Sequence, residues 1–142
     1  MTQEDKSFDT LIKPLLNDHS FAEIDANVIV ECARVEADRI SKDVIKNNQL
    51  RKFYDVIKQI ERQAMGRSGE TPLSDKSLAQ LLFLRPHLHN AVEKAGKRSD
   101  KEKQALKQLE KILSPCLQKN VLQKKEDLRW FVKFFEAIIA YI

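Results

Sequence analysis

The chain has 142 residues, of which 42% are hydrophobic and 32% charged, so it is long enough to bury its own core and too apolar to be disordered. Three glycines and four prolines are too few for the many tight turns of an all-β fold, which leaves helices. The net charge of +4, from 25 Lys+Arg and 21 Asp+Glu, is typical of a protein with a polyanionic partner or simply of a highly soluble one.

Residues 1–20 show weak apolar periodicity and are interrupted by Pro14. They are predicted to form a loosely ordered N-terminal arm or a short helix, ahead of a single helical-bundle domain at residues 21–142. A helix, continuous or broken, is predicted from residue 21 to about residue 46, where apolar side chains fall near helical spacing: Ile24, Val28, Val35 and Ile40.

The clearest helix is predicted at residues 48–64. Its apolar side chains recur at steps of 3 and 4 and form one core-facing stripe: Leu50, Phe53, Ile57, Ile60 and Ala64. Gly66 is a stop signal, and residues 66–72 are predicted to form a loop.

The next two helices are predicted from their start and stop signals. Ser74 is a candidate N-cap, and Pro86 is expected to kink or restart the helix that follows, which ends at Gly96. Ser99 is a candidate cap for a further helix; Pro115 either ends that helix or starts a short successor reaching Leu122.

The last helix, at about residues 126–142, is apolar around most of its circumference. One flank carries Trp130, Phe134 and Tyr141, outside the main apolar stripe. Such a helix is either central in its bundle or partly covered by a partner protein. Together the elements predict an all-α fold, a compact bundle of about five to six helices.

Cys32 and Cys116 are far apart and belong to no CxxC or Cys–His pattern, so two reduced and mostly buried thiols are expected. The first ten residues are acidic and polar where a secretory leader would be basic and then apolar. No apolar run approaches the ~20 residues of a membrane span. We therefore expect a cytoplasmic protein with no membrane partner.

No specific catalytic motif is present: the sequence has no P-loop, GxGxxG, HExxH or nucleophile elbow. His87 and His89 are the only candidates for a metal or acid–base site. On a helix, residues two apart point about 200° away from each other, which is poor geometry for joint ligation. A ribonuclease using these histidines beside Arg85 is a minor alternative. The expectation is no catalysis, no metal and no cofactor.

Basic residues are better organised than the candidate catalytic ones. Residues 1–41 hold 4 basic and 9 acidic side chains, whereas residues 42–142 hold 21 and 12. In the 48–64 helix, Arg51, Lys58 and Arg62 lie within about 40° of one another, with Lys52 beside them. Such a row suits a row of phosphates, although Asp55 interrupts it and an ordinary charged helix face remains the alternative.

A second concentration of basic residues begins near the Gly96 turn with Lys94, Lys97 and Arg98 and continues along the next predicted helix. No aromatic residues of the kind that stack on bases are interleaved with it. An RNA held there is expected to be gripped by its backbone, without sequence readout.

Three segments resemble the small α-helical subunit of type III-A CRISPR–Cas effectors, the Csm complex. The first is NQLRKFY at residues 48–54 and continues to Lys58. The second is LLFLRPHL at residues 81–88, followed by Ala91 and the Gly-Lys-Arg turn at residues 96–98. The third is FVKFFEAIIAY at residues 131–141. Together they extend over about two-thirds of the chain, in the expected order.

The resemblance implies a non-catalytic bundle of five or six helices that takes part in antiviral defence. Several copies of such a subunit stack beside the guide RNA and the target RNA, opposite the repeated backbone subunit. Cleavage and signalling belong to other subunits, among them the large polymerase-like subunit. By the same resemblance, Arg51, Arg85, Lys97 and Arg98 are the expected RNA contacts; Lys52, Lys58, Lys94 and Arg62 are added from the charge pattern.

A rival hypothesis comes from the last helix. There, Trp130, Phe134 and Tyr141 would dock into a groove on a partner protein, and the basic charge would serve only solubility. In that case the protein is a helical protein–protein adaptor with no direct nucleic-acid role.

Overall fold

The computed structural model describes residues 6–41, 47–64, 72–95, 97 and 100–142. Over these residues the chain is helical, and the only pairing of strand type is an isolated bridge between Pro72 and Lys124. The elements in chain order are α1 (Phe8–Leu11), η1 (Lys13–Asn17), η2 (Phe21–Glu23), α2 (Ala26–Ser41), α3 (Asn47–Ala64), α4 (Asp75–Leu82), α5 (Leu84–Ala95), α6 (Asp100–Leu113), η3 (Ser114–Cys116) and α7 (Lys125–Tyr141). The predicted all-α bundle is confirmed.

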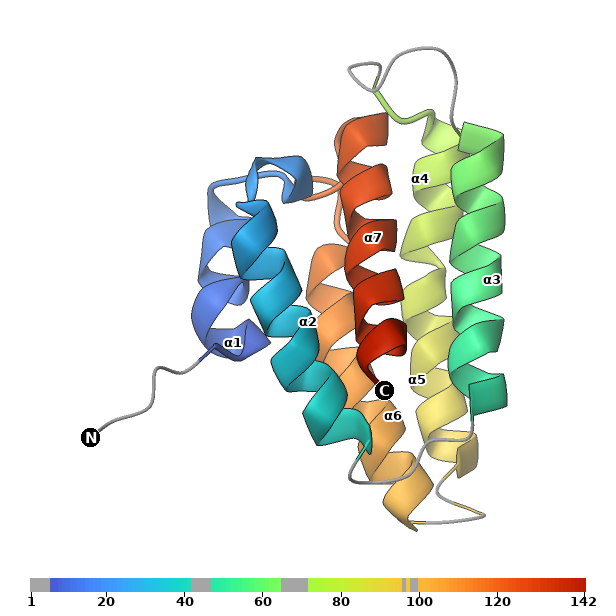
Figure 1. Ribbon diagram of the computed structural model, residues 1–142. Helices are drawn as coiled ribbons and strands as arrows, with labels where there is room; N and C mark the ends of the chain where they lie inside the picture. The colour runs from blue at the N-terminus through green and yellow to red at the C-terminus, as the bar shows by residue number, and fades with distance from the viewer. Residues whose placement is uncertain (1–5, 42–46, 65–71, 96, 98–99) are drawn as a thin grey trace, which may run out of the picture.

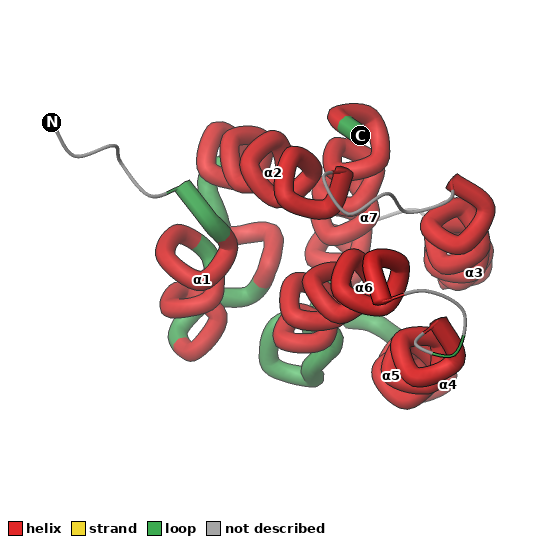
Figure 2. Tube along the Cα trace, turned by 90° about the horizontal axis from the view of Figure 1, so that it is seen from below, coloured by secondary structure: helices red, strands yellow, loops and turns green. Residues whose placement is uncertain are grey.

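The helices are arranged in two layers, which are clearest along the bundle axis (Figure 2). One layer holds α2, α7 and α3; the other holds α1, α6 and the consecutive helices α4 and α5. In Figure 1, α7 lies between α2 and α3, and it packs against both. The α4–α5 pair runs alongside α3, which places two basic segments of the sequence next to each other.

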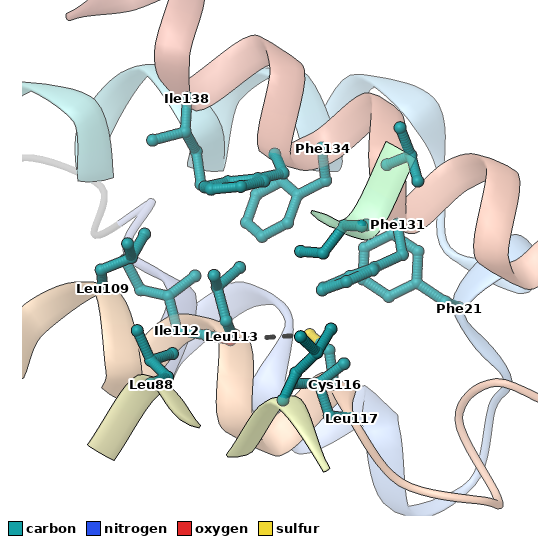
Figure 3. Close-up of a cluster of buried hydrophobic side chains, with 14 of the residues drawn as sticks. Phe21, Leu88, Leu109, Ile112, Leu113, Cys116, Leu117, Phe131, Phe134 and Ile138 are labelled. Carbon is teal, nitrogen blue, oxygen red and sulfur yellow. Dashed lines mark hydrogen bonds between the residues drawn. The ribbon is translucent and has the colours of Figure 1, made fainter. Parts of the chain in front are cut away.

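The last helix is the central one of its layer. Its inward side chains are buried: Leu128, Phe131, Val132, Phe134, Phe135 and Ile138. Figure 3 shows Phe131, Phe134 and Ile138 pointing toward Leu109, Ile112 and Leu113 of α6, so the two layers meet through these side chains. Of the two interpretations of this apolar helix, the central core position is confirmed.

The N-terminal segment is part of the core. Phe8, Ile12 and Leu16 are buried, and the Phe8 ring stacks on Phe134 with centroids 6.3 Å apart. Phe21 packs against the same ring at 5.8 Å. Of the two alternatives for this segment, the short helix is present as α1 and η1. The loosely ordered arm is wrong for residues 6–20, because three apolar residues at steps of four pack beside α7 and α2. Residues 1–5 lie outside the described residues.

The break between α4 and α5 occurs at Phe83, three residues before Pro86. A proline has no N–H to donate, and its ring collides with the carbonyl four residues earlier, which here belongs to Leu82. The Phe83 N–H still bonds Ala79 at 3.0 Å, and the His87 N–H bonds Phe83 at 3.4 Å, so the two helices follow each other directly. The predicted restart is confirmed, with its position shifted by the reach of the proline ring.

Most other boundaries agree with the sequence pattern. The Ser77 N–H donates to the Ser74 hydroxyl at 3.1 Å, which confirms the predicted cap. α6 ends at Leu113, just before Pro115. The predicted 66–72 loop, apart from Pro72, and the signals at Gly96 and Ser99 lie outside the described residues.

Buried carboxylates tie distant segments together. Asp127 is 1% exposed and accepts backbone N–H bonds from Ala22 at 2.8 Å, Gln123 at 3.0 Å and Lys124 at 2.9 Å. It thereby joins the start of α7 to η2 and to the loop before α7.

Glu36, also 1% exposed, accepts hydrogen bonds from the Phe8 backbone at 3.1 Å and from the Gln108 side chain at 2.9 Å. These bonds satisfy groups that would be costly to bury unpaired.

Both thiols are free and fully buried, as predicted. Burial raises the pKa of Cys32 to about 12, and the nearby Glu36 charge adds to the effect. Burial raises the pKa of Cys116 as well. Both groups are therefore thiols rather than thiolates and are unreactive in the folded state.

Among the described residues, no helix combines the length and the apolar character that crossing a membrane requires.

Candidate nucleic-acid interface

The cations of α3 face two different neighbours. The helix docks through its buried stripe, and Arg51 and Lys52, which follow Leu50, are both exposed. Consecutive side chains leave a helix about 100° apart. Arg51 accordingly lies on the side toward α7, next to Glu136 and Ile139, whereas Lys52 lies on the side toward α5.

The side toward α7, the α3–α7 flank, consists of Arg51, Tyr54, Lys58, Glu61 and Glu136. Lys58 is 31% exposed, and its ammonium lies 2.9 Å from a Glu61 carboxylate oxygen and 3.8 Å from a Glu136 oxygen. Lys58, a predicted RNA contact, is therefore paired with one carboxylate from α3 and one from α7. With Arg51 and Lys58 opposed by Glu61 and Glu136, the formal charge of the α3–α7 flank is zero.

Tyr54 belongs to the same network. Its hydroxyl donates a hydrogen bond to the Glu136 carboxylate, and its ring packs against Phe135 with centroids 6.0 Å apart. Burial, followed by this hydrogen bond to a carboxylate, raises the pKa of Tyr54 to about 12. Arg62, one turn beyond Lys58, is exposed. Within the described residues it has no ion-pair partner.

The side toward α5 is a groove of about 520 Å³, which we call the α3–α5 groove. Its walls come from both helices: Lys52, Phe53, Val56, Leu84, His87, Asn90, Ala91 and Lys94. Two predicted RNA contacts that are 42 positions apart, Lys52 and Lys94, therefore meet at one groove. Its lining contains two ammonium groups and no carboxylate.

The other predicted contacts on this part of the chain lie at the two ends of α5, Arg85 in its first turn and Lys97 just beyond its last residue. Arg85 and Lys97 are exposed, and neither has an ion-pair partner among the residues that the structure describes. His89 differs from His87: its Nδ1 lies 3.0 Å from a Glu110 oxygen on α6. Arg98 lies outside the described residues.

The two neighbouring histidines thus face different helices, as their spacing indicates. His87 faces α3 across the groove, whereas His89 faces α6. In the described part of the chain, no three His, Cys, Asp or Glu side chains gather closely enough to hold a metal ion.

The aromatic flank proposed for the adaptor is not continuous. Phe134 is 0% exposed and lies among Phe8 and Phe21, so it is wrong as a docking residue. Trp130 is half-buried, with the Lys133 ammonium 4.9 Å from its ring centroid. Tyr141 is 49% exposed at the end of α7. With Phe134 buried, the two remaining residues of the proposed flank, Trp130 and Tyr141, lie about three helical turns apart on α7.

Sequence reasoning overlooked two exposed apolar side chains: Val56, which lines the groove, and Phe83, one helical turn before His87. Val56 and Phe83 are among the few large apolar residues that are exposed, at 45% and 67%. A signal was available: Leu81, Leu84 and Leu88 form the buried stripe at steps of 3 and 4, and Phe83 lies outside it. The pair of Lys58 with Glu61 has the i,i+3 spacing that a sequence can indicate. The pair with Glu136 had no such signal, because Glu136 is 78 positions away in the sequence.

The chain matches a family model described as Csm2 Type III-A over residues 23–142. A search of curated proteins and a search of solved structures found no match. The matched range contains all three segments that carry the resemblance and adds α2, which that resemblance did not include. Because the match covers most of the chain, the protein belongs to the Csm2 type III-A family and is a small subunit of the type III-A CRISPR effector, the Csm complex.

Proposed function

We propose that this subunit is non-catalytic and holds the backbone of the guide and target RNA in a cytoplasmic antiviral effector. Lys52 and Lys94 of the α3–α5 groove make the main contacts. Arg51, Arg62, Arg85, Lys97 and Arg98 are further RNA contacts. The subunit grips RNA without sequence readout and contributes, beside copies of itself, to a filament-like assembly with the repeated backbone subunit and the large polymerase-like subunit.

The observation that carries this proposal is the joint position of Lys52 and Lys94. Two ammonium groups from separate helices line one groove, and no carboxylate lines it with them. The backbone of an RNA strand is a row of phosphates. The ammonium group of a lysine is a compact positive charge that binds a phosphate electrostatically. Contacts of this kind position the strand without reading its bases.

The proposal is tested with the full-length protein and a labelled single-stranded RNA, using fluorescence anisotropy. The double variant Lys52→Glu/Lys94→Glu is expected to lower the affinity about tenfold or more near 0.15 M salt, where charges more than about 8 Å apart are screened. The slope of log affinity against log salt should become shallower by about 1.4, which corresponds to ~0.7 for each single-strand phosphate that the variant no longer neutralises.

A matched control changes the net charge equally at another site. Lys76 and Lys119 are exposed cations outside the α3–α5 groove, so Lys76→Glu/Lys119→Glu should retain most of the affinity. Circular dichroism verifies that both double variants fold. Equal losses of affinity in the two variants would contradict the groove as the contact site. In that case RNA is held by net charge, or by the Arg51 and Arg62 side of α3.

A further inference from the structure

The α3–α5 groove has a composition that phosphate binding alone does not require. Besides its two lysines, the lining has apolar and aromatic side chains from both helices: Phe53, Val56, Leu84 and Ala91. Phosphates gain nothing from such a surface, because an anion is stabilised by donors and cations rather than by hydrocarbon. We propose that the groove receives one unstacked nucleobase of the bound RNA while Lys52 and Lys94 hold the adjoining phosphates.

The charge of the lining selects this occupant. A ligand for the α3–α5 groove must combine an apolar, flat part with negative charge at its edges, which describes a nucleotide. The other hollows described on the surface contain carboxylates: Glu136 beside Arg51, Asp75 beside Lys119, and Asp9 with Glu110 beside Lys13. These carboxylates offset the positive charge of the cations beside them, so a polyanion is attracted less strongly there. Of the hollows among the described residues, the α3–α5 groove combines cations and an apolar lining without a carboxylate.

Two exposed apolar side chains support a ligand with an apolar face. Val56 lines the groove at 45% exposure. Phe83 is 67% exposed and lies one helical turn before His87, to which it is joined by a backbone hydrogen bond of 3.4 Å. Leaving these side chains in water costs free energy that a bound base would recover. An exposed phenyl ring is also the surface on which single-stranded bases commonly stack.

Polar groups are present to meet the edge of a base. His87 and Asn90 line the groove and are exposed. Neither side chain has a hydrogen-bond partner among the described residues. An asparagine amide offers both donors and an acceptor, and an imidazole offers one of each, so several bases could be accommodated. The expected selectivity between bases is therefore modest.

This inference rests on the proposed function, and the probe separates the two. Affinities of the full-length protein are measured for an oligouridylate and for an abasic ribose-phosphate oligomer of the same length and charge. The wild-type protein is expected to bind the base-bearing strand about tenfold more tightly, which corresponds to ~1.4 kcal/mol. Binding of the abasic strand reports the phosphate contacts alone.

Val56→Lys is the decisive variant, because it adds a cation to the groove and blocks its apolar lining. If only phosphates bind there, both strands should bind more tightly. If a base enters the groove, the preference for the base-bearing strand should fall to about onefold. Val30→Lys is the matched control, since Val30 is 43% exposed and lies on α2. That variant should keep the preference of the wild type.

Asn90→Ala provides a second test that preserves charge and packing, and it should reduce the preference about threefold. The inference is overturned if the wild type binds both strands equally, or if Val56→Lys and Asn90→Ala leave the preference intact. It is also overturned if Val56→Lys, but not Val30→Lys, changes the oligomer mass in light scattering, because the groove is then a protein interface. Equal binding of both strands leaves the proposed function in place, whereas binding of neither overturns both.

Discussion

The two sides of α3 carry cations that look equivalent in the sequence but differ in their surroundings. On the α3–α7 flank, Lys58 is paired with Glu61 and Glu136. At the α3–α5 groove, Lys52 meets a second cation, Lys94, and no carboxylate lines the groove. The electrostatic environment of a surface lysine therefore depends on which helix packs beside it. It follows that a basic helix face is not a binding site until its neighbours are known.

The largest expected effect concerns α7, which contributes Phe134 to the core and Glu136 to the α3–α7 flank. Phe134→Ala should lower the free energy of unfolding by about 3–5 kcal/mol, because it removes a fully buried ring and leaves a cavity. Urea denaturation measures the effect. Tyr141→Ala, at the exposed end of the same helix, should cost about 0.5 kcal/mol or less. If both substitutions lowered the free energy of unfolding by similar amounts, Phe134 would not be a core residue, and the adaptor hypothesis would regain support.

Single neutralising substitutions separate the two sides by RNA affinity. Lys52→Gln should weaken RNA binding about three- to fivefold, as expected for one exposed charge contact worth up to ~1 kcal/mol. Lys58→Gln should change RNA affinity by less than about twofold, since its ammonium is already paired with carboxylates. The measurement is anisotropy with the same labelled RNA for both variants. If Lys58→Gln is the more damaging change, the α3–α7 flank is the RNA site.

The smallest expected effect concerns Tyr54 and its hydrogen bond to Glu136. Tyr54→Phe should lower the free energy of unfolding by about 0.5–1 kcal/mol at neutral pH. The folded pKa is raised to about 12 from the ordinary 10.0, so folding favours the neutral phenol. Its contribution is therefore fully present below pH 10 and is lost as the pH rises from about 10 to about 12.

Denaturation curves of the wild type and Tyr54→Phe, recorded between pH 8 and pH 12, should converge as Tyr54 ionises. The difference in phenolate absorbance between the two proteins isolates the titration of Tyr54 from that of Tyr141. A titration midpoint near pH 10 for Tyr54 would show that its hydroxyl is not hydrogen-bonded to Glu136. The α3–α7 flank would then lack this link between the two helices.

The helical class and most boundaries could be predicted from the sequence, because periodicity and capping act within a few residues. The stripe beginning at Leu50 predicts α3, and the Ser74 hydroxyl caps α4 by a bond to a residue three positions away. The N-terminal segment was the exception. Its short helical turns are stabilised by contacts of Phe8 with Phe134 and by a bond to Glu36, which no local pattern reveals.

The candidate site divides in the same way. The order of residues alone indicates which side chains are basic, that they lie on helix surfaces, and which family the three segments resemble. The packed helices were needed to establish that Lys52 and Lys94 share a groove, that Lys58 is neutralised by Glu136, and that Phe134 is core. Charge pairing and burial act between atoms a few ångströms apart, and packing brings together residues that the sequence separates.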